Sequence, residues 1–360
     1  MSGSSRRALL LPGWLASTSG SAAQACAQTL AAHGWSPGSL PTMELLRWPG
    51  AGATLQLAGL VPGLFDAVHF GALRNGGRLS SAAAAYMRFG LSSRLREHLD
   101  RNPTELVIST GPAAVVTVSA LAPRYPALRH VVLCLDAAPH RLWIAEHVDL
   151  YLMTHPGACQ HVLKFQPGAR VATIAPPVRP EFYRAPSYRS ARVGLGIEDG
   201  DRCVLLITGI RGLPRLDQIA RALTDVGLHV IAVAGHHGRL GSRLRQLADG
   251  KRKLSVFGYT DRLAELMAAA DLVITSPGTV CAEARTVGRP LLLLDAVPGH
   301  GRENLLSELA RGDAAITPAR PEAVAAAALA SLERFPLRHP AMSLAEWEAE
   351  FCGALKVIDA

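Results

Sequence analysis

A loop and helix start at residues 276–283 hold the clearest residue types for binding a phosphate group. The loop contains Pro277 and Gly278, and Thr279 opens a helical pattern in which Glu283 follows four residues later. Glycine lets the backbone approach a phosphate, and the first amides of a helix are available to bind it. Residues four apart share one helix face, so the Glu283 carboxylate could accept hydrogen bonds from the two hydroxyls of a ribose. A structural interpretation is equally open, in which Thr279 caps the helix and Glu283 favours its positive end.

A second loop offers glycine and a basic side chain in the same kind of position. Gly209 and Arg211 lie directly after an apolar run at 204–207, and Arg211 could pair with a diphosphate. Turns that join a strand to a helix through glycine are common in α/β proteins, so this loop alone is a weak signal.

A third loop, at residues 295–302, follows a buried apolar run and is rich in glycine and proline. His300 within it, and Glu303 and Asn304 directly after it, could bind the hydroxyls of a sugar. A solvated turn followed by an ordinary helix start is the alternative.

These loops need elements that bring them together, and the pattern of the whole chain supplies such elements. Apolar runs alternate with helical patterns throughout, which is typical of a parallel α/β sheet. Ligands of open α/β sheets bind at the carboxyl ends of the strands, where all three loops lie. The predicted strands are residues 8–11, 106–109, 131–135, 149–153, 171–174, 204–208, 229–234, 254–257, 272–275 and 291–294.

A proline-rich segment divides the chain. Four prolines occur between residues 176 and 186, and they cannot continue a helix or a central strand. We therefore predict a stiff linker here. The predicted organisation is an N-terminal Rossmann-like domain at 1–178, a linker at 179–190, a C-terminal Rossmann-like domain at 191–335, and a helical segment at 336–360 that packs back toward the N-terminal domain.

Composition limits the class of protein. With 360 residues, 49% of them hydrophobic, the chain can form two α/β cores. No apolar run reaches the ~18 residues of a membrane span, and Ala8–Leu11 is too short for a signal peptide, so we expect a cytoplasmic protein. Six cysteines without a CxxC pair give no metal-binding pattern. The net charge of +8 favours anionic partners, although the arginine bias of a GC-rich genome explains it equally.

A series of motifs in the second half resembles a known family. It includes Gly258-Tyr259-Thr260-Asp261, Asp271-Leu272-Val273-Ile274-Thr275, Pro277-Gly278, Glu283-Ala284, Gly288-Arg289-Pro290 and Pro298-Gly299. In the first half, Leu135-Asp136-Ala137-Ala138-Pro139-His140-Arg141-Leu142-Trp143 extends the likeness. The motifs resemble the diacylglycerol glycosyltransferases, a GT-B, family 28-like group that includes the monogalactosyldiacylglycerol synthases and is related to the peptidoglycan-precursor GlcNAc transferase.

The resemblance implies a GT-B fold, which is α/β with two Rossmann-like domains facing each other across a cleft. The domain at 1–178 would bind the acceptor, and the domain at 191–335 would bind a UDP-sugar donor. Inverting transfer without a metal or another cofactor is also implied. By position, the backbone near Tyr259 would meet the base, Glu283 the ribose, and Gly278 with Thr279 the diphosphate. His300 stands beside the sugar, where the family commonly has glutamine, so the donor sugar stays open.

The chain departs from the family at the residues commonly associated with its catalytic site. The loop after the first strand lacks the family's histidine, and Gly111 replaces a second one. Transfer to a hydroxyl needs a base near the acceptor oxygen, and the candidates are Asp136 and His140. An acceptor with a phosphate or carboxylate group would already be ionised and would need no strong base.

Residues 60–99 mix apolar side chains with several arginines. In the family this region is associated with the membrane and the lipid acceptor, and a basic amphipathic segment can lie on an anionic leaflet. A plain core helix with a solvated arginine face is the alternative.

The leading hypothesis is an inverting glycosyltransferase of the hexosyltransferase type. It would move a sugar from a UDP-sugar to a lipid, lipid-linked or specialised-metabolite acceptor. It would act in the cytoplasm or at the inner face of the cell membrane, with no nucleic-acid partner. The alternatives are a sugar-nucleotide epimerase and a non-catalytic donor-binding protein.

Overall fold

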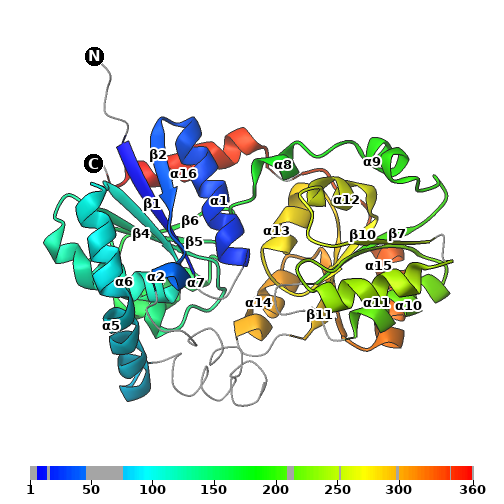
Figure 1. Cartoon of the computed structure of the whole chain (residues 1–360), viewed down its shortest axis with the longest axis horizontal. Helices are drawn as coiled ribbons and strands as arrows, with labels where there is room; N and C mark the ends of the chain where they lie inside the picture. The colour runs from blue at the N-terminus through cyan, green and yellow to red at the C-terminus, as the bar shows by residue number, and fades with distance from the viewer. Residues whose placement is uncertain are drawn as a thin grey trace. The chain divides into compact units, whose positions relative to one another are not determined.

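The computed structural model describes residues 6–13, 17–45, 76–208, 215–250, 253–296, 300–340 and 342–358. The chain divides into two units, each built around one six-stranded sheet (Figure 1). Unit 1 comprises Met1–Arg179, Pro298–Glu303 and Leu344–Ala360, and unit 2 comprises Pro180–Val297 and Asn304–Ser343.

The sheet of unit 1 has the strand order β2-β1-β3-β4-β5-β6, and all its neighbours pair in parallel. Its central strands are continuous apolar runs, as a sheet covered on both faces requires. The strands are β1 (Arg6–Pro12), β2 (Trp35–Ser39), β3 (Leu106–Thr110), β4 (Arg129–Cys134), β5 (Leu150–Met153) and β6 (Val171–Thr173).

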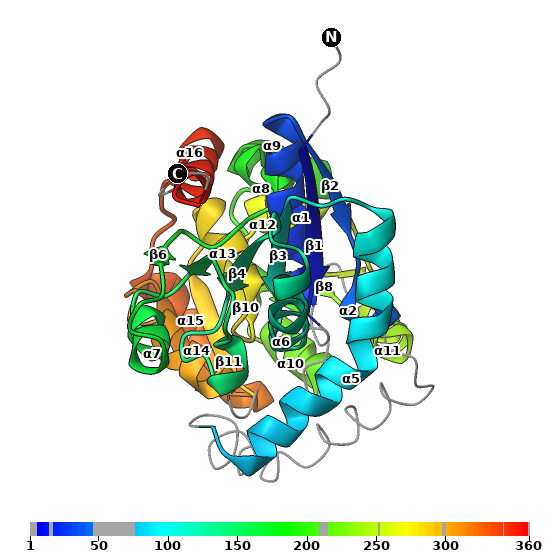
Figure 2. The same cartoon turned by 90° about the vertical axis from the view of Figure 1, so that its left-hand side faces the viewer.

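The helices of unit 1 connect these strands. The long helix α5 packs against α6 (Figure 2). Buried leucines and valines of these helices form one core with β1 and β3. The last helix, α16, also belongs to this unit, because the Trp347 indole donates to the Ala175 carbonyl at 3.0 Å. The helices are α1 (Ser17–Ala32), α2 (Thr42–Leu45), α5 (Arg78–Arg101), α6 (Pro112–Leu121), α7 (Ala158–Phe165) and α16 (Leu344–Lys356), with 3-10 turns η2 (Ala122–Arg124) and η3 (Arg141–Trp143).

The sheet of unit 2 has the strand order β12-β11-β10-β7-β8-β9, again with all neighbours parallel. On one face, alternate residues of β7, β8, β10 and β11 pack against α10, α11 and α15 to form the main core. The strands are β7 (Cys203–Ile207), β8 (His229–Val233), β9 (Leu254–Phe257), β10 (Leu272–Thr275), β11 (Leu291–Asp295) and β12 (Ala314–Pro318).

The helices of unit 2 begin within the proline-rich segment. Tyr188 of α9 donates to the Asp271 carboxylate at 2.7 Å, so this helix is fixed to the start of β10. The helices are α8 (Pro180–Tyr183), α9 (Tyr188–Leu195), α10 (Leu216–Asp225), α11 (Gly238–Ala248), α12 (Leu263–Ala269), α13 (Thr279–Thr286), α14 (His300–Leu309) and α15 (Pro321–Arg334). Helix α14 is shared, because its residues up to Glu303 are assigned to unit 1 and those from Asn304 to unit 2.

The predicted α/β fold with two Rossmann-like sheets is confirmed. All ten predicted strands are present, and β2 and β12 are two strands that the sequence did not predict. No helix in the described ranges has the length and apolarity needed to cross a bilayer.

Candidate donor and acceptor sites

The turn between β10 and α13 presents the first candidate site. Pro277 and Gly278 are half-buried in this turn, and Gly278 is the residue before the first helical turn. The N-cap residue, Gly278, makes no side-chain cap hydrogen bond, and Thr279 is already the first helical residue of α13. The interpretation of Thr279 as a helix cap is therefore wrong. The first amides of α13 open the helix without a side-chain cap, which is the arrangement that binds anions.

Glu283 lies one turn further along α13 and is buried, with 3% of its surface exposed. Burial of a carboxylate is costly unless hydrogen bonds compensate it. Glu283 is thus not a solvent-facing residue that merely favours the positive end of the helix. It lies four residues after Thr279, on the same face of α13.

Tyr259 lies just after β9 and stacks on His236, which follows the neighbouring strand β8. The two ring centroids are 4.3 Å apart and the ring planes differ by 21°. Tyr259 is 71% exposed, so the pair presents an aromatic surface to solvent at the carboxyl edge of the sheet. The sequence analysis missed His236, although the run Gly-His-His-Gly directly after a strand was a signal for it.

The sheet order sets the distance between these features. Strand β9 is three positions from β10, which corresponds to about 14 Å at the usual strand spacing. Strand β11, which precedes α14, is the next neighbour of β10 on the other side. A ligand that reached from Tyr259 to the start of α13 would therefore have to be extended.

The structure describes two of the remaining predicted donor residues, Glu303 and Asn304. Glu303 and Asn304 are half-buried in the first turns of α14. His300 begins that helix, and its side chain lies outside the described part of the structure, as do Gly209 and Arg211.

At the carboxyl edge of the unit 1 sheet, both predicted base candidates are engaged in holding one loop. The Oδ2 atom of Asp136 accepts a hydrogen bond from the indole of the buried Trp143 at 3.0 Å. The Nδ1 atom of His140 accepts from the backbone amide of Leu142 at 3.3 Å. With Nδ1 as the acceptor, a neutral His140 carries its proton on Nε2. In this geometry Nε2 is a donor, and Asp136 is the better candidate for a base.

The position that lacks the second family histidine is sterically closed. A Cβ atom on Gly111 would collide with the Cα atom of Gly13. These two glycines lie at the ends of the neighbouring strands β3 and β1. No side chain fits at position 111 unless the backbone moves, so the missing histidine accompanies a changed local packing.

A histidine that the sequence analysis did not select lies at the same edge. His155 is buried and follows β5, the strand that pairs with β4. The preceding residue, Thr154, donates from its backbone amide to the Cys134 carbonyl at 3.2 Å, which extends this pairing toward Asp136. The run Thr-His-Pro directly after an apolar strand was the signal for it.

In the ranges that the structure covers, there is no group of three or more His, Cys, Asp or Glu side chains that could hold a metal ion.

Comparison with known proteins identifies relatives of the chain. No protein-family model matches it. The processive diacylglycerol β-glucosyltransferase of Bacillus subtilis (strain 168) is 28% identical over 229 residues, which are 61% of this chain and 58% of that protein. The chain therefore matches less than two thirds of this relative's length.

Solved structures share the fold at low sequence identity. MurG of Acinetobacter baumannii gives a TM-score of 0.56 at 15% identity, covering 98% of both chains. The UDP-GlcNAc 2-epimerase of Neisseria meningitidis, bound to UDP-GlcNAc, gives 0.60 at 11%, covering 97% of this chain and 99% of that one. The sequence relative and the shared fold agree with the resemblance in the motifs. The chain is therefore a GT-B-fold protein homologous to the diacylglycerol β-glucosyltransferases.

Proposed function

We propose that the chain is an inverting, metal-independent glycosyltransferase that uses a UDP-sugar. Unit 2 would bind the donor and unit 1 the acceptor, which would be a lipid, a lipid-linked molecule or a specialised metabolite. The activity named for the Bacillus relative supports a sugar transfer. The protein would work in the cytoplasm, at the inner face of the cell membrane where the acceptor is a lipid.

The observation that carries this proposal is the start of α13. It combines an uncapped helix N-terminus after Gly278 with the buried carboxylate of Glu283 one turn later. The helix start suits a diphosphate, because its amides and its partial positive charge favour anions. The carboxylate suits a ribose diol, and the exposed ring of Tyr259 suits a base.

The chemical step follows from this placement. An acceptor oxygen would attack the anomeric carbon from the face opposite UDP, while the bond between that carbon and the phosphate oxygen breaks. The departing UDP gains a negative charge, which the start of α13 would stabilise. The proton of an acceptor hydroxyl would pass to a base, for which Asp136 is the candidate.

Calorimetric titration tests the donor site directly. We expect UDP and at least one of UDP-glucose, UDP-galactose and UDP-GlcNAc to bind the wild-type chain. Replacement of Glu283 by Gln should weaken UDP binding by about 1.5–3 kcal/mol, the usual loss for a hydrogen bond to a charged group. The control is Glu322→Gln, because Glu322 is an exposed glutamate in the first turn of another helix of unit 2. Equal binding by both variants, or no binding of any UDP-sugar, would contradict the proposal.

The assignment of the base is tested by turnover. An Asn at position 136 can still accept from the Trp143 indole, so Asp136→Asn should keep the loop in place. We expect it to lower kcat by about 10²–10⁴-fold while UDP affinity is unchanged. His140→Ala should also lower turnover, because it removes the acceptor that fixes the Leu142 amide. Full activity of both variants would rule out both residues.

A sugar-nucleotide epimerase is the second candidate, because an enzyme of that type shares the fold over nearly the whole chain. Incubation with UDP-GlcNAc alone separates the two. Proton NMR would show a second sugar isomer if the protein were an epimerase, whereas the proposed transferase releases UDP only when an acceptor is added.

Contact with a membrane is proposed through the first half of α5. Ala82, Ala85, Tyr86 and Phe89 are all exposed, and their spacing places them on one helix face. Phe89 is 90% exposed, and Arg88 is exposed beside it. An apolar stripe next to basic side chains is typical of helices that lie on anionic lipid.

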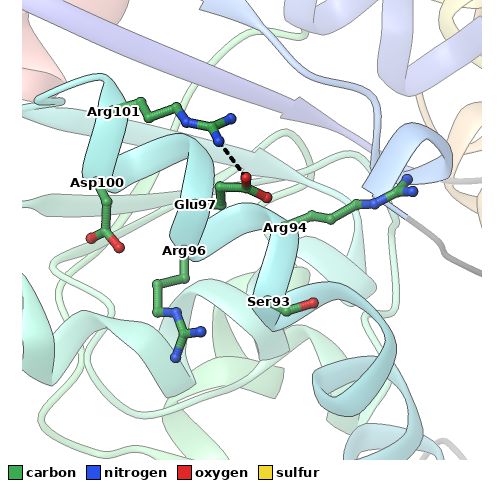
Figure 3. Close-up of a pocket in the computed structure, with 6 residues that line it drawn as sticks. All are labelled: Ser93, Arg94, Arg96, Glu97, Asp100 and Arg101. Carbon is green, nitrogen blue, oxygen red and sulfur yellow. Dashed lines mark hydrogen bonds and ion pairs between the residues drawn. The ribbon is translucent and has the colours of Figure 1, made fainter.

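The second half of α5 has a different surface. Six side chains of this helix line a pocket, and Figure 3 shows Arg101 paired with Glu97 there. The distance of this ion pair is 2.5 Å. The pocket is lined by three basic and two acidic side chains and by none of the predicted site residues. The residues are Ser93, Arg94, Arg96, Glu97, Asp100 and Arg101.

Sedimentation with lipid vesicles tests the proposed membrane contact. The wild-type chain should bind vesicles that contain phosphatidylglycerol more tightly than vesicles of phosphatidylcholine alone. Phe89→Ser should weaken this binding, and Val193→Ser should not, because Val193 is an exposed apolar residue of unit 2 outside the stripe. Equal effects of the two substitutions would contradict a role for α5.

A further inference from the structure

Three charged side chains of unit 2 form a buried cluster that we name the clamp: Arg285, Glu308 and Asp313. The Arg285 guanidinium donates through Nε and Nη2 to both carboxylate oxygens of Asp313, each at 2.7 Å. Its Nη1 atom donates to the Glu308 carboxylate, so the guanidinium is bonded to both acidic side chains. The exposed fraction of the side chain is 18% for Arg285, 10% for Glu308 and 11% for Asp313.

Within the clamp, the pKa values of Asp313 and Arg285 are both shifted in the direction that favours the charged form. Burial by itself would raise the pKa of Asp313, but hydrogen bonding to Arg285 and its charge outweigh burial and lower that pKa. Burial would likewise lower the pKa of Arg285, and the two carboxylates raise it instead. Asp313 and Arg285 therefore stay charged as a pair, and removing either partner would leave a buried charge without compensation.

The clamp joins the helices α13 and α14 to the start of strand β12. Arg285 is near the end of α13, Glu308 near the end of α14, and Asp313 directly before β12. A guanidinium offers donors in a fixed planar arrangement, so it sets the orientation of its partners and not merely their proximity. A rotation of α13 relative to α14 would break one of these contacts.

The same helices carry the proposed donor residues. Glu283 precedes Arg285 by two residues on α13, and Asn304 precedes Glu308 by four residues on α14. Residues four apart lie on one helix face. The contact that fixes Glu308 therefore also fixes the orientation of the helix face that carries Asn304. A displacement of the clamp side chains would therefore also displace Glu283 on α13 and Asn304 on α14.

We infer that Arg285, Glu308 and Asp313 are positioning residues that fix α13 against α14 and so preorganise the donor site. This inference rests on the proposed function. Groups that must contact a diphosphate and a sugar at the same time lose much of their effect when they are displaced by a fraction of an ångström to an ångström. The clamp does not need to touch the ligand in order to act.

A purely stabilising role gives a different expectation. Buried ion clusters can often be replaced by apolar side chains of similar size without loss of stability, and sometimes with a gain. An apolar cluster would keep the unit folded but would lose the fixed orientation that the guanidinium imposes. Stability and donor affinity can thus be separated by experiment.

The test uses the full chain with all three positions changed, as Arg285→Met, Glu308→Met and Asp313→Leu. Urea unfolding followed by far-UV circular dichroism reports stability, and calorimetric titration with UDP reports affinity. We expect a midpoint at or above the wild-type value and a Kd for UDP that is roughly ten- to hundredfold higher. The control is Arg262→Met, which removes an exposed ion pair with Glu265 in the same unit and should leave the Kd unchanged.

A second variant guards against a failure of the triple variant to fold. Arg285→Lys keeps a positive charge but loses the two-pronged contact with Asp313. It should raise the donor KM about threefold or more with little change in kcat. If the wild-type chain binds UDP and both variants bind it equally well, the inference is wrong and the proposed function stands. If the wild-type chain binds no UDP, the proposed function itself fails.

Discussion

His130 is a fully buried histidine in the middle of the unit 1 sheet. Its Nε2 atom lies 3.0 Å from the Ser109 hydroxyl on the neighbouring strand. Burial lowers the pKa of His130 from 6.5 to about 3, because the charged imidazolium would have to be removed from water. A protonated His130 is therefore incompatible with the folded sheet over most of the acidic range.

The sign of the resulting pH dependence follows directly. In the unfolded chain His130 binds a proton near pH 6.5, whereas in the folded chain it does so only near pH 3. Acid below pH 6.5 thus favours the unfolded state. The free energy of unfolding should fall by about 2 kcal/mol at pH 5 from this one group, and by about 5 kcal/mol once the pH is below 3.

Tryptophan fluorescence is a suitable assay because it reports on one unit alone. The described tryptophans, Trp35, Trp143 and Trp347, all lie in unit 1, and the other two, at positions 14 and 48, belong to the same stretch of the chain. Urea unfolding at pH 7 and pH 5 should be compared for the wild-type chain and for His130→Gln, which keeps a polar group opposite Ser109. His229, whose pKa is also lowered by burial, lies in unit 2 and does not enter this signal.

The quantity to compare is the loss of unfolding free energy between pH 7 and pH 5 in the wild-type chain and in the variant. Between pH 7 and pH 5 the wild-type unit should lose about 2 kcal/mol more than the variant loses. An equal loss in both proteins would mean that the folded sheet accepts the proton on His130, and the argument from burial would be refuted.

Further substitutions at Gly288, Gly227 and Tyr259 test other parts of the structure. Gly288→Ala should destabilise unit 2 by about 3 kcal/mol or more, because Gly288 has a φ of 75° and a Cβ there would collide with the Arg338 carbonyl. Gly227→Ala, at a φ of 87° but with no atom within 4 Å, should cost only about 1–2 kcal/mol in the same circular dichroism assay. Tyr259→Ala should weaken UDP binding by about 1–3 kcal/mol, since it removes the exposed ring that stacks on His236, while Tyr259→Phe should bind normally. Normal UDP binding by Tyr259→Ala would exclude Tyr259 from the base site.

The central strands could be predicted because each is a short apolar run that sheet burial requires. Strand β11 begins with four leucines, and it contains no proline or glycine that would argue against a strand. Strand β2 was missed because it contains Pro37 and Gly38, which argue against a strand. Its place at the edge of the sheet explains why they are tolerated, and only the tertiary structure reveals that place.

The grouping of the proposed donor residues on α13 could be predicted because they are contiguous in the sequence. Gly278, Thr279 and Glu283 lie within one loop and one helix, so spacing alone places them together. The contact of Gly13 with Gly111 could not be predicted, since it joins two strand ends almost a hundred residues apart. The clamp likewise depends on side chains brought together by the packing of three elements.

We propose that the carboxyl edge of the unit 2 sheet binds a UDP-sugar at the start of α13. A crystal structure of the chain with UDP is the decisive experiment. We expect the diphosphate within hydrogen-bond distance of the first amides of α13, the ribose hydroxyls on the Glu283 carboxylate, and the base beside Tyr259. Ordered UDP at any other place on the chain would contradict it.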